Sequence, residues 1–208
     1  METVPEKPRM SKKQKTTLIV LAMVAVCLIL AAVTVFWVLP RVMRERFQLK
    51  YVDLIRKYSE EYDLEPTLVA GVIYTESKYR DRAVSNAGAR GLMQIMPATG
   101  EEIAEMLREP FDPENLFDPE ISIRYGCCYL RWLLDLPEFD QNIAVALAAY
   151  NAGPTNAKAW LQKYGLDSRG RIAYIPYEET RNYVNRVLQA QENYANLYPD
   201  AFAEGTEE

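Results

Sequence analysis

The 208-residue sequence contains no histidine, and this absence removes several classes of catalytic site. Ser-His-Asp and Cys-His catalysis both need an imidazole, and so does a His-ligated zinc site. Acid–base chemistry in this chain must therefore come from carboxylates, lysine or tyrosine.

The sequence contains three cysteines, Cys27, Cys127 and Cys128. Their spacing fits no metal-ligand pattern, and adjacent cysteines bridge each other only under strain. We interpret all three as small apolar residues rather than a disulfide framework. The net charge is −5, and no stretch joins basic to aromatic residues as nucleic-acid binders do. We therefore expect no nucleic-acid partner.

A long uncharged segment lies near the N-terminus, with no charged residue between Lys15 and Arg41. Its apolar core, residues 18–39, makes a helix of about 33 Å, enough to cross the hydrocarbon core of a membrane. Phe36 and Trp37 stand at its end, where amphipathic rings favour the membrane interface. A cleaved signal peptide is the alternative, but the run is long for one and no A-x-A cleavage site follows it. We expect an uncleaved anchor.

Basic residues flank this segment on both sides and give only a slight bias toward a cytoplasmic N-terminus. The domain prediction is a cytoplasmic tail (1–15), a transmembrane anchor (16–39), a juxtamembrane segment (40–50), one folded domain (51–199) and an acidic tail (200–208). Helical periodicity dominates the folded part, so the predicted fold class is mostly α. Beyond the helix after Pro66, helices are expected near residues 99–107, 119–134, 141–150, 155–164 and 179–197. Asp118 and Asp140 are the expected N-caps of two of them.

The helix after Pro66 carries the first candidate for chemistry. Its apolar residues, among them Val69, Val72 and Ile73, form a buried stripe, and Glu76 continues that face. A partly desolvated carboxylate has a raised pKa and stays protonated as a general acid. A helix-end glutamate that reaches solvent or a salt bridge is the other interpretation of the same pattern.

Two further clusters follow. Gln94 is a lone amide among apolar neighbours that include Met93 and Met96, so it needs an internal or a ligand partner. Tyr150 and Asn151 stand at the end of an expected helix, where such a pair is more often structural than sugar-binding.

Taken together, these segments resemble the motifs of the soluble-lytic-transglycosylase family. The matching segments are Glu76-Ser77, residues 83–85 (AVS), 88–97 (GARGLMQIMP), 148–154 (AAYNAGP) and 179–184 (ETRNYV). They occur in the family's order, and the similarity spans about residues 51–194.

The resemblance implies a lysozyme-like α-helical domain with a glycan groove, preceded here by a single N-terminal transmembrane helix. It also implies cleavage of the β-1,4 bond between N-acetylmuramic acid and N-acetylglucosamine without water, with no metal or organic cofactor. By motif, Glu76 is the single catalytic acid and base. The other matches, which line the groove or orient the carboxylate, are Ser85, Met93, Gln94, Met96, Tyr150, Asn151 and Tyr183. Met93 and Met96 are expected to form the apolar floor, and Ser77 to brace the helix end.

The expected partners are peptidoglycan strands and the membrane, with the catalytic domain outside the cytoplasm. One alternative is a goose-type lysozyme, which needs a second carboxylate, and Asp81 is its candidate by proximity in sequence. Another is a non-catalytic glycan-binding protein of cell-wall assembly. Residues 166–176, between two expected helices, form either a loop at the groove edge or a plain surface connection.

Overall fold

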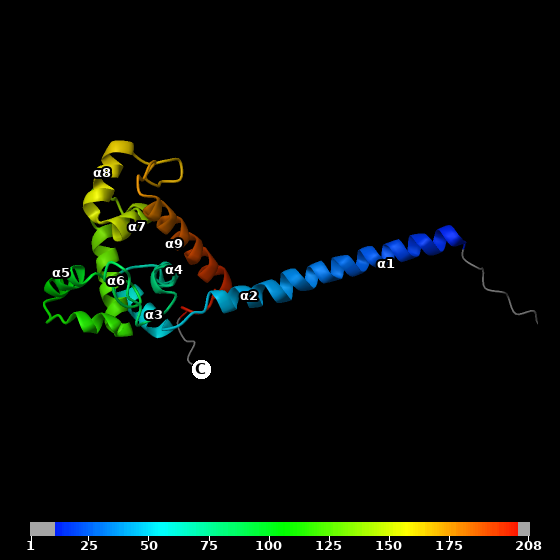
Figure 1. Cartoon of the computed structure of the whole chain (residues 1–208), viewed down its shortest axis with the longest axis horizontal. Coiled ribbons are helices and arrows are strands. Elements are labelled where there is room, and N and C mark those ends of the chain that lie inside the picture. Colours follow the sequence, from blue (N-terminus) through cyan, green and yellow to red (C-terminus); the bar gives the residue numbers. More distant parts are fainter. Residues whose placement is uncertain (1–10, 204–208) are drawn as a thin grey trace, which may run out of the picture. The chain divides into compact units, whose positions relative to one another are not determined.

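The structure, a computed structural model, describes residues 11–203 and divides them into two units, residues 11–46 and 47–203. The first unit is helical throughout: α1 (Lys12–Val33), a π-helical turn (Thr34–Val38) and α2 (Leu39–Arg46). Figure 1 draws them as one continuous rod. Ser11 begins it with a capping box to Gln14. The helix Lys12–Arg46 is long and apolar enough to cross a membrane, and its apolar residues are exposed.

This helix is longer at both ends than the predicted span 16–39, and it takes in much of the predicted juxtamembrane segment. The second unit starts at Phe47, slightly before the predicted domain boundary. Parts of both predicted tails, residues 1–10 and 204–208, lie outside the described residues.

Helices and their connections build the second unit, as the sequence predicts. They are α3 (Val52–Glu61), α4 (Pro66–Ser77), α5 (Pro97–Leu107), a 3₁₀ helix (Pro113–Phe117), α6 (Pro119–Leu134), α7 (Ile143–Ala152), α8 (Pro154–Tyr164) and α9 (Glu178–Leu197). Strand-like pairing within the described part of the chain is limited to isolated bridges: Val84 with Arg90, Arg90 with Ile95, and Leu166 with Ile172. The mostly α fold class is confirmed.

The N-cap residues of α6 and α7 show where the local sequence predicts the start of a helix and where it does not. Asp118 caps α6 by accepting a hydrogen bond from the main-chain N–H of Ile121, as predicted. The prediction for Asp140 is wrong, because Asp140 and Gln141 both have positive φ angles and lie outside the helix. Asn142 caps α7 instead, by accepting a hydrogen bond from the N–H of Val145.

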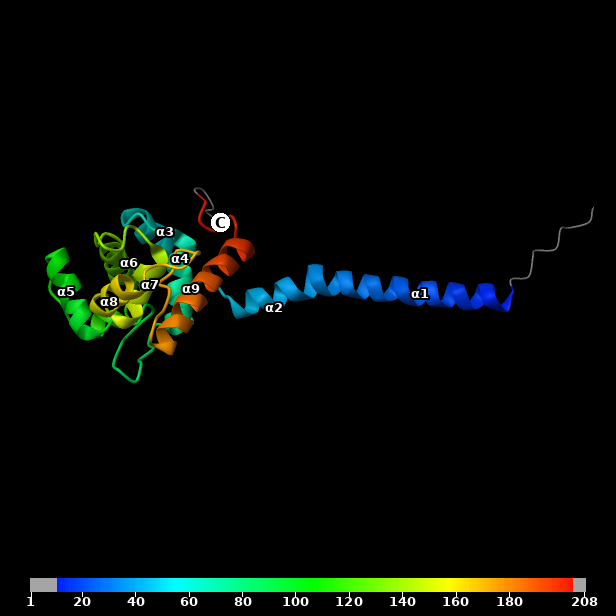
Figure 2. The same cartoon turned by 90° about the horizontal axis from the view of Figure 1, so that it is seen from above.

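The core centres on α4, which packs side by side with α9 in both views (Figures 1 and 2). Gly71 makes this packing possible, since a Cβ there would lie 3.0 Å from the main-chain nitrogen of Gln191 and 3.0 Å from the carbonyl oxygen of Val187. A glycine inside a helix costs some helix propensity, and here it allows close approach of two backbones. The residues of α9 that lie between this contact and the N-terminus of α9 are therefore beside the C-terminal turn of α4.

All three cysteines are free, as predicted. Cys127 and Cys128 are buried on α6, and burial raises the pKa of the Cys127 thiol. They pack as small apolar side chains.

Candidate active site

Glu76 occupies the last turn of α4, directly after the helix's buried stretch 67–73. The helix ends there because Lys78 takes a left-handed conformation at φ 51°. The Ser77 hydroxyl donates to the carbonyl of Ile73 at 3.1 Å, so Ser77 braces this helix end as expected. The backbone that carries Glu76 is therefore held by a largely buried helix.

The environment of Glu76 favours its neutral form. The residue keeps some exposed surface, whereas its carboxyl group is largely surrounded by protein, and this burial raises its pKa from 4.5 to about 7. The Tyr183 hydroxyl and the positive charge of Arg186 lower the pKa, and the negative charge of Glu179 raises it again. Burial dominates, so Glu76 is mostly protonated below neutral pH and about half protonated close to it.

Two buried tyrosine hydroxyls share this environment. Burial, followed by the charge of Glu76, raises the pKa of both Tyr150 and Tyr183, so both remain protonated. The Tyr150 hydroxyl donates to the carbonyl of Met93 at 2.9 Å. The Tyr183 hydroxyl faces Glu76 closely enough to affect its pKa, but it meets no described partner at the distance and angle of an ordinary hydrogen bond. The contact with Glu76 is thus looser than a full hydrogen bond.

Residues 83–95 form a compact loop beside this helix end. The Ser85 hydroxyl accepts from the N–H of Ala89 at 3.0 Å. The Gln94 side-chain nitrogen donates to two carbonyls, those of Ala83 at 3.1 Å and Gly91 at 2.9 Å. The partner that Gln94 requires is therefore internal, and both of its amide hydrogens tie the loop together.

Met93 and Met96 differ in their exposure to solvent. Met96 is 40% exposed at the start of α5 and offers apolar surface. Met93 is fully buried, with its sulfur packed where a Cβ on Gly126 would fall, and its N–H donates to the Ser122 hydroxyl. This corrects the expectation that Met93 lines the floor of a groove, because its side chain belongs to the core.

Asn151 connects two helices. Its side-chain oxygen accepts from the Thr180 hydroxyl at 2.7 Å, which links the end of α7 to the first turn of α9. Glu179 precedes Thr180, so this link also fixes the segment that carries the acidic neighbour of Glu76.

Asp81 is not among the groups whose charge affects Glu76. Its carboxylate accepts from the N–H of Arg82, and its charge acts on Tyr51. Glu179 is the acidic residue near Glu76, although we did not select it from the sequence as a site residue. Only the packing of α9 on α4 brings the two together. Among residues 11–203, no cluster of three Cys, Asp or Glu side chains is arranged to hold a metal ion.

Comparison with known proteins identifies the family of the chain. Residues 53–170 match the model of the transglycosylase SLT domain. The chain belongs to this family. It is 35% identical over 162 residues to the soluble lytic murein transglycosylase of Escherichia coli K12, covering 76% of this chain and 25% of that protein. It is also 31% identical over 169 residues to the membrane-bound lytic murein transglycosylase C of Pectobacterium atrosepticum, covering 70% of this chain and 46% of that protein.

Solved structures of the family confirm the lysozyme-like α-helical fold. The crystal structure of the 70 kDa soluble lytic transglycosylase of E. coli superimposes with a TM-score of 0.70 at 34% identity, over 77% of this chain and 26% of that one. An inactive Glu-to-Gln mutant of the lytic transglycosylase Slt from Pseudomonas aeruginosa gives a TM-score of 0.66 at 30% identity, over 74% of this chain and 25% of that one. The SLT family chain described here thus spans only about a quarter of its soluble relatives.

Proposed function

We propose that this chain is a membrane-anchored lytic transglycosylase that cleaves peptidoglycan strands between N-acetylmuramic acid and N-acetylglucosamine. The observation that carries the proposal is a single buried carboxyl group, Glu76, whose pKa of about 7 leaves a large fraction of it protonated near neutral pH. A general acid needs a pKa near the working pH, so this group suits protonation of a glycosidic oxygen. The inactive Glu-to-Gln mutant of the Pseudomonas relative is consistent with one essential glutamate.

In the proposed reaction, Glu76 donates its proton to the leaving glycosidic oxygen. The N-acetyl carbonyl of the muramic acid stabilises the positive charge at C1, which is substrate assistance rather than the two-carboxylate scheme. The ionised Glu76 then accepts the proton of the C6 hydroxyl, and O6 attacks C1 to form a 1,6-anhydro ring. One residue acts as acid and then as base, and no water is consumed.

The hydrogen bonds of the candidate residues support different roles for them toward the sugar. Gln94 donates both amide hydrogens to carbonyls, and Tyr150 donates its hydroxyl hydrogen to Met93. The Ser85 hydroxyl accepts from the N–H of Ala89, which leaves its own hydrogen available to be donated. We therefore propose Ser85 and the amide nitrogen of Asn151 as donors to the glycan. Met96 supplies apolar surface, while Gln94 and Tyr150 shape the site.

A goose-type lysozyme remains the second candidate because of one observation: Glu179 lies near Glu76 and could activate water. Glu179 is exposed, so its carboxylate is not held in a fixed position for that role. The non-catalytic alternative leaves the raised pKa of Glu76 unexplained, because binding a neutral glycan does not require a desolvated acid.

The apolar helix Lys12–Arg46 and the membrane-bound relatives support membrane anchoring. We propose that the helix crosses the membrane once, with the N-terminus in the cytoplasm. This orientation places residues 47–203 on the side where peptidoglycan is found.

Mass spectrometry of muropeptides released by the full chain in detergent tests the reaction. The proposal expects products lighter by one water than hydrolysed ones, and their loss in Glu76→Gln. Glu101→Gln, which changes an exposed glutamate of α5, is the matched control and should retain activity. Products that carry the added water would establish the lysozyme and direct attention to Glu179. Equal activity of Glu76→Gln and wild type would exclude Glu76 as the acid.

A further inference from the structure

The loop between α8 and α9 borders a cavity that is separate from the site around Glu76. Residues of this loop, of α7 and of α9 enclose a cavity of about 190 Å³. Three arginines line it, Arg169, Arg171 and Arg181, together with Asp167 and Asn185. The remaining wall is mostly apolar and includes Ile172, Ile175 and Val184. A cavity with an apolar wall and several cationic side chains suits a small amphiphilic anion.

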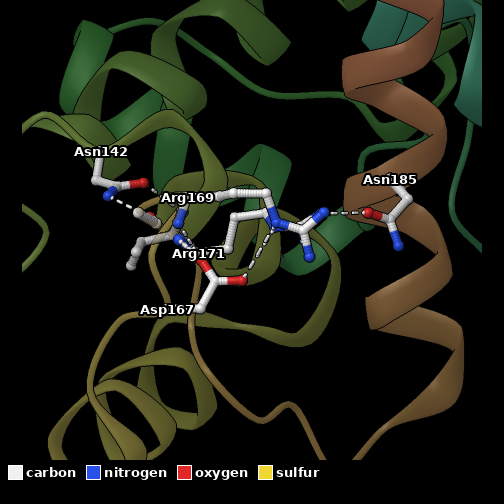
Figure 3. Close-up of polar contacts among 7 residues, drawn as sticks. Asn142, Asp167, Arg169, Arg171 and Asn185 are labelled. Atoms are coloured by element: carbon white, nitrogen blue, oxygen red, sulfur yellow. Dashed lines mark hydrogen bonds and ion pairs between the residues drawn. The ribbon is translucent and has the colours of Figure 1, made fainter.

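The loop is firmly held, as Figure 3 shows. The Asp167 carboxylate accepts from the N–H groups of Arg169 and Arg171 at 2.9 and 3.0 Å. Leu166 and Ile172 pair across the loop. Asn142, the cap of α7, donates to the carbonyl of Gly170 at 2.7 Å. The guanidinium groups are therefore presented by a preorganised backbone, which lowers the entropic cost of binding.

The positive charge of the three arginines exceeds the negative charge that lines the cavity. Arg171 contacts Asp167 at 3.5 Å and donates from Nη1 to Asn185 at 2.8 Å. Arg181 donates from Nη1 to the carbonyls of Ile175 and Pro176. Asp167 is the one acidic residue that lines the cavity, so two of the three positive charges are not balanced there. Each guanidinium has five N–H donors, and these contacts use only some of them.

The cavity lies on the other side of α9 from Glu76. Tyr183 faces Glu76, whereas Arg181 and Asn185 are each two residues away and so point about 200° around the helix. A helix with its side chains is about 10–12 Å across. An extended peptide of four residues spans roughly 13–14 Å. A stem peptide attached to a sugar at Glu76 therefore has a length comparable to the width of the helix that separates Glu76 from the cavity.

We propose that this cavity binds a carboxylate of a peptidoglycan stem peptide, with the arginines holding the carboxylate and the apolar wall holding the adjacent carbon atoms. The inference rests on the proposed function, since it assumes that the glycan at Glu76 is peptidoglycan. Stem peptides bear several free carboxylates, and a planar guanidinium recognises a carboxylate through paired hydrogen bonds. The site would make the domain favour strands that still carry their peptides.

Arg169 is the residue to change first. Its side chain is 72% exposed and its ion pair with Asp167 is long, at 3.7 Å, so the fold does not depend on it. Arg169→Glu places a negative charge at the cavity. Arg108→Glu is the matched control, an exposed arginine directly after α5 that does not line the cavity. Arg171→Lys is a second variant, which keeps the charge but loses the planar fork.

The first experiment titrates the full chain in detergent with a soluble stem tetrapeptide, with the same peptide fully amidated, and with inorganic phosphate, by calorimetry. We expect the free tetrapeptide to bind, the amidated form to bind at least about tenfold more weakly, and Arg169→Glu to weaken binding about fivefold, because a charge-assisted contact is lost. Arg171→Lys should also weaken it, and Arg108→Glu should bind as wild type. Equal binding of both peptides, no effect of Arg169→Glu, or binding of phosphate alone would overturn the proposal.

The second experiment compares cleavage of peptidoglycan with that of glycan strands stripped of their peptides. Arg169→Glu should raise KM for the peptide-bearing strands about fivefold and leave kcat, and cleavage of stripped strands, unchanged. The same loss on both substrates would overturn the proposal. If wild type cleaves neither substrate, the proposed function fails, whereas the peptide titration still decides the inference about the cavity.

Discussion

The buried hydroxyl of Tyr183 faces the carboxyl group of Glu76, and it lowers the pKa of that carboxyl while burial raises it. The hydroxyl itself stays protonated, because burial and the charge of Glu76 both raise its pKa. A neutral donor beside a buried acid stabilises the ionised form without adding a charge. This arrangement suits a residue that must give up a proton and later take one back.

The rate of glycan cleavage should fall as the pH rises through about 7, because Glu76 must start protonated and its pKa is raised to about 7. Removing the negative charge in Glu179→Gln lowers this pKa and should move the alkaline limb to lower pH. Removing the positive charge in Arg186→Gln raises it and should move the limb to higher pH. Rate–pH profiles of purified variants measure both shifts. If the alkaline limbs of the two variants moved in the same direction, Glu76 would not be the group that sets the pH profile.

Glu76→Gln should stabilise the fold at alkaline pH and change it little in acid. The folded-state pKa of Glu76 is raised from 4.5 to about 7, so its contribution to stability is fully present below the unfolded value and is lost as pH rises through the folded one. The loss amounts to at most about 3 kcal/mol at about 1.36 kcal/mol per pKa unit. For a domain of this size that corresponds to several degrees in Tm.

Thermal unfolding at about pH 4 and about pH 9 provides the measurement, with the exposed Glu101→Gln as control. The difference in Tm between Glu76→Gln and wild type should appear only at the higher pH. The same difference in Tm at both pH values would mean that ionisation of Glu76 does not destabilise the fold.

Tyr183→Phe should raise the pKa of Glu76, because it removes the hydroxyl that favours the ionised carboxylate. The alkaline limb of the rate profile should then move to higher pH. Tyr79→Phe is a matched control: its hydroxyl is also buried without a described partner of ordinary geometry, but it belongs to the aromatic cluster with Tyr194. A purely structural role for Tyr183 would lower Tm without moving the profile.

Local signals predicted much of the fold. The bounds of α6 match residues 119–134 because Asp118 supplies an N-cap and Pro119 suits the first helical turn. The start of α7 was mispredicted because Asp140 and Asn142 are equally good capping residues. The hydrogen bond from Asn142 to Gly170, 28 residues away, belongs to the tertiary structure and leaves no local trace.

The same limit applies to the site. Glu76 was predictable because it continues the buried face of one helix. Met93 was not, because its burial depends on space left by Gly126 on α6. The effect of Glu179 on Glu76 arises from the packing of α9 on α4, which the sequence indicates only indirectly, through Gly71 inside a helix.

Gly91→Ala should destabilise the domain more than Gly88→Ala, and the difference isolates a steric requirement of the loop that carries Ser85 and Gln94. Both glycines have positive φ, at 76° and 90°, so alanine costs about 1–2 kcal/mol at either position. At Gly88 a Cβ meets nothing within 4 Å, whereas at Gly91 it would fall 1.8 Å from the carbonyl oxygen of Leu116. Relieving that clash should cost about 1–3 kcal/mol more.

Urea unfolding of the two variants beside wild type measures this difference, and cleavage of peptidoglycan reports its effect on the site. Gly91 also donates its N–H to Ala83 and accepts from Gln94, so a shift at Gly91 disturbs two of the bonds that fix the loop. We therefore expect Gly91→Ala to lose activity even at temperatures where it stays folded, and Gly88→Ala to keep most of its activity. Equal free energies of unfolding for the two variants would show that the backbone at Gly91 relaxes freely, and that the loop is not held against the segment containing Leu116.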